Sequence, residues 1–204
     1  MPLFQKWNCP NQAQIAIWRI SEDISFFENA LNLNDIPIKH LQRRTEYLAG
    51  RYLLKYLQPD IPIEEIIINE QGKPHLQTEH VHFSITHSYP YVACMIQHKH
   101  QVGIDLQCWH PNIAPIAQKF ISPKELALLP PGSAYLHMAW TAKEAAFKYQ
   151  GLKGVDFIKN LPICAYQENK GISNIIINNN LISKNAQIKL NSLIFNDFVI
   201  SWSQ

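Results

Sequence analysis

The chain has little charge and contains no long hydrophobic run. Charged residues make up 17% of its 204 residues, and the formal net charge at pH 7 is only +2. Because no run of Lys and Arg occurs either, we expect no nucleic-acid partner. No apolar run approaches the roughly 20 residues that a membrane-spanning helix needs, so we expect no association with a membrane.

Cysteine is scarce, and its placement argues against the common cysteine-based sites. The four cysteines lie far apart, and no Cys-x-x-Cys motif occurs. The first residues, Met-Pro-Leu-Phe-Gln-Lys, lack the apolar stretch of a secretion signal. We therefore predict buried thiols in a cytoplasmic protein, at Cys9, Cys94, Cys108 and Cys164.

Nine histidines raise the alternative of a transition-metal site. His80 and His82 would share one face of a strand, but no Cys or acidic residue lies at a spacing that completes a tetrahedral shell. We interpret the segment His98-Lys-His-Gln101 as a polar hairpin loop between two strands.

Hydrophobic residues, at 47%, can form a substantial core in one domain or two small ones. Helix-like and strand-like segments follow a similar order twice, which predicts an α+β fold with halves at residues 1–100 and 101–204. The first half is predicted to hold strands near 14–20, 66–69, 73–76, 81–85 and 92–96 and helices near 21–33 and 38–57. The second is predicted to hold a strand at 102–106, a helix at 113–120, a helix opened by a Ser122-Pro-Lys-Glu125 capping box, a helix around Trp140, and strands near 163, 175, 188 and 198.

The segment Trp140-Thr-Ala-Lys-Glu-Ala-Ala-Phe-Lys148 places ionisable groups where a helix is expected to carry a buried stripe. One helix face would hold Trp140, Lys143, Glu144 and Phe147, with Lys148 at its edge. A charge held against apolar surface must be paired, solvated or used in chemistry, so this mixture indicates the wall of a site. The alternative is an amphipathic helix that buries its alanines and carries an ordinary pair between Glu144 and Lys148.

Asp105 closes a short apolar strand, Gln101-Val-Gly-Ile-Asp-Leu-Gln107, in which Gly103 leaves room for another backbone segment to approach. Asp105 and Glu144 together would supply the hard oxygen ligands that Mg²⁺ prefers, and Lys143 and Lys148 would then face phosphates. The alternative for Asp105 alone is a turn or helix-capping aspartate.

Five motifs occur in an order that resembles the 4′-phosphopantetheinyl transferases, specifically the larger surfactin-type group, over about residues 40 to 155. They are Arg43-Arg44-Thr-Glu-Tyr-Leu-Ala-Gly50-Arg51, Gly72-Lys73-Pro74, Phe83-Ser-Ile-Thr86-His87-Ser88, Gly103-Ile-Asp105 and Trp140-Thr-Ala-Lys143-Glu144-Ala-Ala-Phe-Lys148. Each motif alone is weak, whereas the ordered set is a strong signal. The resemblance implies two similar halves related by pseudo-twofold symmetry, with coenzyme A in the cleft between them.

The implied activity is transfer of the 4′-phosphopantetheine arm of coenzyme A to a serine of an apo acyl carrier protein or peptidyl carrier domain, with release of 3′,5′-ADP. The resemblance implies that Asp105 and Glu144 hold Mg²⁺ against the pyrophosphate and that Glu144 is the base for the serine, directly or through a water. Lys148 would stabilise the phosphates. Lys143 would contact a phosphate or pair with a neighbouring carboxylate.

The other matched residues are implied ligands of coenzyme A: Arg44, Arg51, Lys73, Thr86, His87 and Ser88. From the residues alone, His87 would end the buried row of a strand, Lys73 would be a solvated turn lysine, and Arg44 and Arg51 would be surface charges seven residues apart on one helix face.

One position departs from the family pattern. Many surfactin-type members carry a second acid two residues after the first, whereas this chain has Gln107 there. We therefore expect two protein carboxylates on Mg²⁺ instead of three. The alternative function is a non-catalytic coenzyme A or nucleotide-binding module. A monomer is expected, and a mixed patch at Lys119, Phe120, Ile121 and Lys124 is a candidate docking surface for the carrier.

Overall fold

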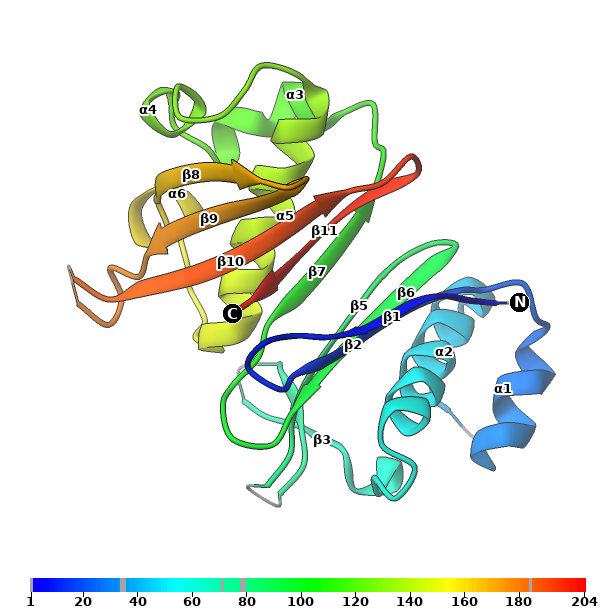
Figure 1. The fold of residues 1–204 in the computed structure, drawn as a ribbon. Helices are drawn as coiled ribbons and strands as arrows, with labels where there is room; N and C mark the ends of the chain where they lie inside the picture. Colours follow the sequence, from blue (N-terminus) through cyan, green and yellow to red (C-terminus); the bar gives the residue numbers. More distant parts are fainter. Residues whose placement is uncertain (1, 34–35, 71, 78–79, 184) are drawn as a thin grey trace. The chain divides into compact units, whose positions relative to one another are not determined.

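The chain folds into two units, each with its own sheet and hydrophobic core (Figure 1). The first unit comprises residues 1–100 and the second comprises residues 101–204. The structure is a computed structural model that describes residues 2–33, 36–70, 72–77, 80–183 and 185–204. Helices and antiparallel sheets occur in both units, so the predicted α+β composition is confirmed.

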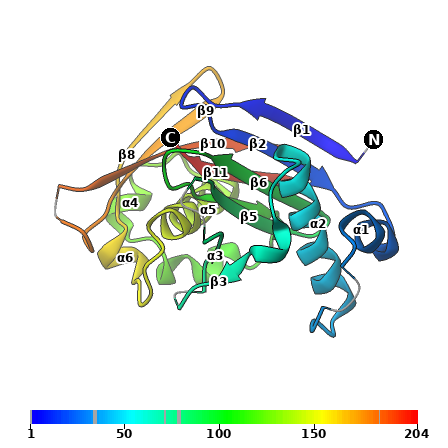
Figure 2. The same ribbon diagram turned by 90° about the horizontal axis from the view of Figure 1, so that it is seen from below.

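The first unit is built on a four-stranded antiparallel sheet with the order β1-β2-β6-β5. Its strands are β1 (Leu3–Asn8), β2 (Gln14–Arg19), β5 (His82–Ser88) and β6 (Tyr91–Gln97), and its helices are α1 (Ile24–Leu31) and α2 (Leu41–Leu57). Between α2 and β5 lie the 3-10 helix η1 (Ile63–Glu65) and the small pair β3 (Ile67–Ile68) and β4 (Pro74–His75). Helix α1 lies beside α2 (Figure 2).

Helix α2 packs against this sheet because an apolar stripe repeats along it at helical spacing. Leu48, Leu53 and Leu54 are fully buried in the core, where they meet β2 and β6. Gly50 brings the helix close to β5, since a Cβ atom there would lie 2.8 Å from Cγ2 of Ile85.

The second unit holds a five-stranded antiparallel sheet with the order β7-β11-β10-β9-β8. Its strands are β7 (Ile104–Cys108), β8 (Ile163–Asn169), β9 (Ile172–Asn178), β10 (Gln187–Ile194) and β11 (Phe198–Ser203). Its helices are α3 (Ile113–Ile116), η2 (Ala117–Lys119), α4 (Pro123–Leu126), α5 (Ser133–Gln150) and α6 (Phe157–Asn160). The capping box predicted at Ser122 and Glu125 is present at the start of α4.

Helix α5 lies unusually close to the backbone at the start of β7, because alanines on the helix face a glycine just before the strand. Ala142, Ala145 and Ala146 are fully buried on the helix. A Cβ atom at Gly103, just before β7, would lie only 2.0 Å from the carbonyl oxygen of Ala145 and 2.6 Å from the backbone nitrogen of Tyr149. The predicted close backbone approach at Gly103 is therefore confirmed, and the helix it admits is the one that carries Glu144.

The two sheets share part of their strand order. In the first unit, the strand before the helices, β2, pairs with the last strand, β6, and β6 pairs with β5. In the second unit, β7 pairs with the last strand, β11, and β11 pairs with β10. A long helix packs on each of these three-stranded arrangements.

Several expectations need correction. The strand β1 and the short helix α6 were not predicted, because β1 alternates weakly and α6 has only four residues. The segment 98–101 is not a hairpin loop, since β6 and β7 belong to different sheets. Cys164 is exposed and Cys108 is only partly buried, so the prediction of buried thiols holds for Cys9 and Cys94.

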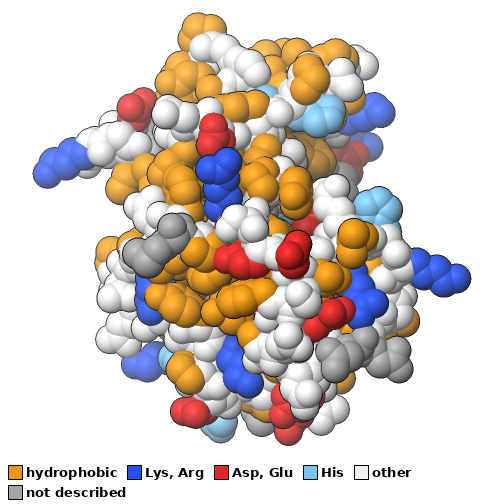
Figure 3. All heavy atoms as spheres, turned by 90° about the vertical axis from the view of Figure 1, so that its right-hand side faces the viewer, with side chains coloured by type: hydrophobic (Ala, Val, Ile, Leu, Met, Phe, Trp, Pro, Cys, Tyr) orange, Lys and Arg blue, Asp and Glu red, His pale blue; other side chains and the backbone are white. Residues whose placement is uncertain are grey.

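The surface of the described chain mixes side-chain types. On the face drawn in Figure 3, acidic and basic side chains lie among hydrophobic ones. Phe120 and Ile121 do not contribute to any such surface, because they are 1% and 4% exposed and belong to the core of the second unit. The predicted docking patch is therefore wrong in its two apolar residues, Phe120 and Ile121, which are buried. Among the described helices, none combines the length and the apolar character that crossing a membrane requires.

Candidate functional site

Asp105, Glu144 and Lys148 form a charged cluster in the second unit. Asp105 is the second residue of β7, and the other two lie one turn apart on α5. Lys148 Nζ lies 2.7 Å from Asp105 Oδ1 and donates a second hydrogen bond, of 3.2 Å, to the carbonyl oxygen of Ile104. The structure therefore brings together all three residues that were predicted for catalysis, through the close contact of α5 with β7.

Glu144 has a strongly perturbed carboxyl group. Its pKa is raised from 4.5 to about 7, chiefly by burial and secondly by the negative charge of Asp105, while Lys148 acts in the opposite direction. Two carboxyl groups that repel each other across a partly buried site are a suitable donor set for a hard divalent cation, which would favour ionisation of both. The cluster thus fits a Mg²⁺ ion chemically.

The cluster offers two carboxylates to such an ion. No group of three or more His, Cys, Asp or Glu side chains that could hold a metal occurs in the part of the chain that the structure describes. Gln107, two residues after Asp105 on β7, donates from Nε2 to the carbonyl oxygen of Cys108 at 3.3 Å. Water and substrate oxygens would have to complete an octahedral shell.

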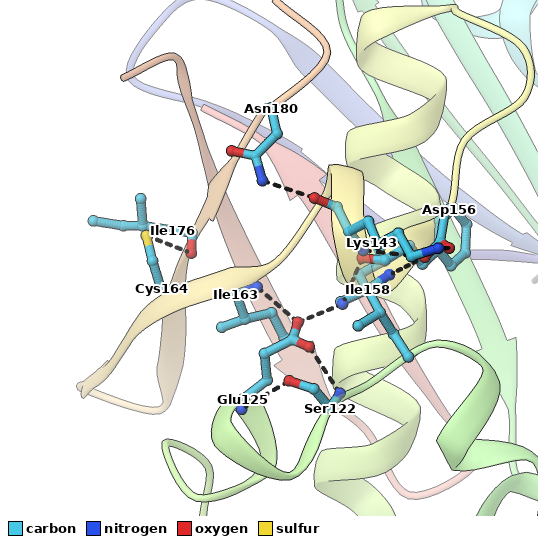
Figure 4. Close-up of polar contacts among 11 residues, drawn as sticks. Ser122, Glu125, Lys143, Asp156, Ile158, Ile163, Cys164, Ile176 and Asn180 are labelled. Carbon is cyan, nitrogen blue, oxygen red and sulfur yellow. Dashed lines mark hydrogen bonds and ion pairs between the residues drawn. The ribbon is translucent and has the colours of Figure 1, made fainter. Parts of the chain in front are cut away.

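Lys143 of α5 lies in a network of polar contacts with Glu125 (Figure 4). Its side chain is fully buried and forms an ion pair with Glu125 of the α4 capping box. Lys143 Nζ also donates to the carbonyl oxygen of Phe157 at 2.9 Å. Of the two roles left open for Lys143, the structure gives it the pair with a neighbouring carboxylate, and its assignment as a coenzyme A ligand is not supported.

Glu125 connects three segments of the second unit. Its Oε1 atom accepts from Lys143 and from the backbone N–H of Ile163, at 2.8 Å from the latter. Its Oε2 atom accepts from the backbone N–H of Ser122, also at 2.8 Å. Burial lowers the pKa of Lys143, while the contact with Glu125 opposes that change. This network holds α4, α5 and the start of β8 together, and it supports the helix on which Glu144 lies.

A pocket of about 340 Å³ in the first unit gathers a second set of charged residues. It is lined by Ile38, Arg43, Glu46, Tyr47, Arg51, Ile68, Pro74, Ile85 and His87. His87 Nδ1 lies 3.1 Å from Glu46 Oε2, and the imidazole remains 48% exposed. The guanidinium of Arg51 lies over the ring of Tyr47, 3.3 Å from its centroid. Two arginines and an imidazole in one hollow suit an anionic ligand.

Burial affects the cationic groups at and beside this pocket. The pKa of Arg51 is lowered by desolvation, with the opposing influence of Tyr47. Burial lowers the pKa of Lys73 to about 8. Lys73 precedes the pocket residue Pro74 in the turn between β3 and β4, where Asn69 accepts its backbone N–H at 2.8 Å. A partly desolvated cation gains from an anion placed beside it.

The remaining predicted ligands are placed differently. Arg44 forms an ion pair of 2.6 Å with Glu28, which joins α2 to α1, and it does not line the described pocket. Thr86 is 3% exposed and alternates with His87 along β5, so the two side chains point to opposite faces of the strand. Ser88 is partly buried at the end of β5.

The sequence motifs contained pocket residues that were not singled out. Arg43, Tyr47 and Arg51 recur at intervals of four along α2, which places them on one helix face. Glu46 lies next to this face and reaches His87. The four-residue spacing could have identified Arg43 as a pocket residue. The prediction used the seven-residue spacing of Arg44 and Arg51 instead, and so chose Arg44.

Comparisons with known proteins agree with this arrangement. The family model described as the 4′-phosphopantetheinyl transferase superfamily matches residues 101–202, which is half of the chain. This match includes β7 and α5, and with them Asp105, Glu144 and Lys148.

Curated relatives carry the same family name. The chain is 34% identical over 113 residues to the 4′-phosphopantetheinyl transferase gsp of Aneurinibacillus migulanus, covering 52% of this chain and 46% of the relative. It is 34% identical over 117 residues to AcpT of Escherichia coli strain K12, covering 53% and 59%. It is 27% identical over 126 residues to HetI of Nostoc sp., covering 54% and 53%. The matches thus span about half the length of these relatives, all named 4′-phosphopantetheinyl transferases. The chain belongs to the 4′-phosphopantetheinyl transferase superfamily.

Proposed function

We propose that this chain transfers the 4′-phosphopantetheine arm of coenzyme A to a serine hydroxyl of an apo acyl carrier protein or peptidyl carrier domain, releasing 3′,5′-ADP. The observation that carries the proposal is the cluster of Asp105, Glu144 and Lys148 within the half of the chain that matches the family. Two coupled carboxyl groups beside an ammonium group provide the charges that phosphoryl transfer from a pyrophosphate requires.

In the proposed reaction, the serine oxygen forms a bond to the β-phosphorus of coenzyme A while the bond from that phosphorus to the bridging oxygen breaks. The bridging oxygen leaves with 3′,5′-ADP, and the serine proton passes to Glu144, directly or through a water. A cation held by this carboxyl group keeps it ionised, which is the form that can accept a proton. When bound by Asp105 and Glu144, Mg²⁺ would neutralise the charge of the pyrophosphate. Lys148 would stabilise charge on the phosphate oxygens.

The first unit is proposed to bind the nucleotide end of coenzyme A at the pocket on α2. Arg43, Arg51 and His87 line the pocket, and Lys73 lies next to its wall. The two arginines, Lys73 and the Arg51–Tyr47 stack suit a phosphorylated adenosine. The proposal replaces Arg44 with Arg43 as the second arginine of the site, because Arg44 pairs with Glu28.

The shared strand order supports the further proposal that the two units are repeats related by pseudo-twofold symmetry. We also propose a cytoplasmic monomer. The proposed carrier-docking surface keeps the exposed Lys119 and Lys124. Leu126, the last residue of α4, is 44% exposed and would supply the apolar contact that the buried Phe120 cannot.

The proposal is tested by intact-mass spectrometry of a panel of apo carrier proteins incubated with the chain, coenzyme A and Mg²⁺. We expect at least one carrier to gain the mass of one phosphopantetheine arm. A chelator or the substitution Asp105→Asn should abolish the gain, and Glu144→Gln should abolish transfer while coenzyme A still binds.

The matched control is Glu168→Gln, which makes the same change from acid to amide at an exposed position of β8. It should leave the transfer rate within about twofold of the unchanged protein. Absence of transfer to every carrier, with coenzyme A binding intact, would refute the enzyme and favour a non-catalytic coenzyme A-binding module.

A further inference from the structure

Lys148 forms an ion pair with Asp105, one of the two carboxylates that the proposed cation would need. Its ammonium group lies 2.7 Å from Oδ1 of Asp105, in a contact where the Asp105 side chain is only 10% exposed. A Mg²⁺ ion would approach a carboxylate oxygen to about 2.0–2.1 Å. An ammonium group and a divalent cation at those distances from one carboxylate repel each other strongly, because they are only a few ångströms apart in a poorly solvated site.

We propose that Lys148 and the divalent cation compete for Asp105, so that Lys148 is the resident counter-ion of this carboxylate until the cation displaces it. The inference rests on the proposed function in one respect, the location of the cation at Asp105 and Glu144. It adds a role for Lys148 before any substrate binds: the lysine limits the affinity of the empty site for metal.

The position of Lys148 on α5 explains why it is held there. Its Nζ atom also donates to the carbonyl oxygen of Ile104, so two acceptors from β7 anchor the ammonium group at one place. Lys148 is 27% exposed at its side chain, which leaves it room to move away from Asp105. Glu144 lies four residues earlier on the same helix, so an ion that enters between Asp105 and Glu144 meets Lys148 at once.

The charge balance gives the direction of the effect. With both carboxylates ionised, Lys148 leaves the cluster with one net negative charge, and a divalent cation would turn this into one net positive charge. Without an anionic substrate, that excess is unfavourable. Replacing Lys148 by a neutral residue removes both the competing ion pair and the repulsion, and it should tighten metal binding by about fivefold or more, the factor that corresponds to a modest, partly exposed ion pair.

The test is a titration of the purified chain with Mn²⁺, followed by the electron paramagnetic resonance signal of the free ion, without coenzyme A and at fixed pH and ionic strength. The variants are Lys148→Met and Lys148→Gln, of which the second keeps a hydrogen-bond donor without charge. Lys153→Met is the matched control, because it removes the same charge from an exposed lysine of the second unit. Asp105→Asn identifies the site.

We expect both Lys148 variants to bind one Mn²⁺ about fivefold more tightly or better, Lys153→Met to bind as the unchanged chain does, and Asp105→Asn to lose the tight site. If Asp105→Asn weakens binding but both Lys148 variants bind no more tightly than the unchanged chain, the competition is refuted and the cation site stands. If Asp105→Asn leaves Mn²⁺ binding unaltered, the proposed cation site is refuted and the competition with it. If no variant binds Mn²⁺, the competition is refuted, because removal of Lys148 should have been enough to let the empty site bind the ion. Circular dichroism spectra establish that each variant is folded.

Discussion

Replacing Glu144 by Gln is expected to stabilise the chain in the absence of metal, and by more as the pH rises. The pKa of Glu144 is raised from 4.5 to about 7 in the folded protein, chiefly by burial and secondly by the charge of Asp105. An acid of this kind holds its proton more tightly when folded than when unfolded. Ionisation of Glu144 therefore lowers the stability of the folded chain. The stability is greatest below pH 4.5, falls between pH 4.5 and about 7, and stays at the lower value above that pH.

The size of the effect follows from the two pKa values. Ionisation of Glu144 costs the folded protein about 1 kcal/mol at pH 5, about 2 kcal/mol at pH 6 and about 3 kcal/mol at pH 8. Glu144→Gln removes this cost while keeping nearly the same shape. The difference in unfolding free energy between the variant and the unchanged chain should grow in the same order. These values are upper bounds, because solvent at the partly buried side chain reduces them.

The assay is urea unfolding at pH 5, 6 and 8 in the presence of a chelator, followed by circular dichroism and tryptophan fluorescence. Trp140 lies on α5 one turn before Glu144. Because Trp7 and Trp18 lie in the first unit, tryptophan fluorescence follows the unfolding of both units. Glu168→Gln is the control for the change from acid to amide. A stability difference for Glu144→Gln that stays constant from pH 5 to pH 8, or that shrinks, would refute the electrostatic account of this site.

Two further substitutions test the framework around the cluster. Gly103→Ala should lower the unfolding free energy measured in urea by more than about 3 kcal/mol, because the added methyl group would lie 2.0 Å from the carbonyl oxygen of Ala145. The control Gly154→Ala should cost only about 1 kcal/mol, because a methyl group there meets no atom within 4 Å although φ is +71°. Equal costs for the two variants would contradict the packing argument. Lys143→Met should lower the thermal midpoint and cost about 3–5 kcal/mol of unfolding free energy, because it leaves Glu125 buried without its cation. The double variant Lys143→Met with Glu125→Gln should recover part of that loss. A double variant whose loss equals the sum of the two single losses would show that the two side chains act independently.

The charged cluster of the second unit was largely predictable from the sequence. Glu144 and Lys148 are separated by one helical turn, and Asp105 follows a glycine in an apolar strand, so local periodicity and the family resemblance pointed to the same residues. The expected position of Asp105 at the end of that strand was wrong, because β7 begins at Ile104 and continues to Cys108. The contact between Lys148 and Asp105 follows from packing α5 on β7, which the glycine and the alanines made possible. Local signals placed each side chain on its own element, the family resemblance grouped them, and the packing of α5 on β7 brings them together.

The environment of Lys143 was not predictable in the same way. The capping box fixed the conformation of Glu125 at the start of α4, but its meeting with Lys143 depends on how α4 lies against α5. A helix-face argument groups Lys143 with Glu144, and only tertiary packing separates a buried ion pair from a partly open site. Arg44 of α2 shows the same limit, since only the packing of α1 on α2 brings it to its partner Glu28.

The first unit was predicted less completely because its sheet depends on long-range pairing. β2 and β6 carry strongly apolar sequences, β5 alternates the apolar Phe83 and Ile85 with polar residues, and the expected strands overlap all three. β1 has mostly exposed residues and gains its structure from pairing with β2, for which its own sequence offers little signal. The weak strand thus depends on its neighbour.

The network around Glu125 has a consequence for how related sequences can vary. One carboxylate serves a helix cap, a strand start and a buried lysine, so no single replacement at position 125 can meet all three demands. A lysine at position 143 without its acid, or the acid without its lysine, would leave one charge stranded in the core. Positions 125 and 143 are therefore expected to change together among homologues or not at all, as a linked pair in evolution.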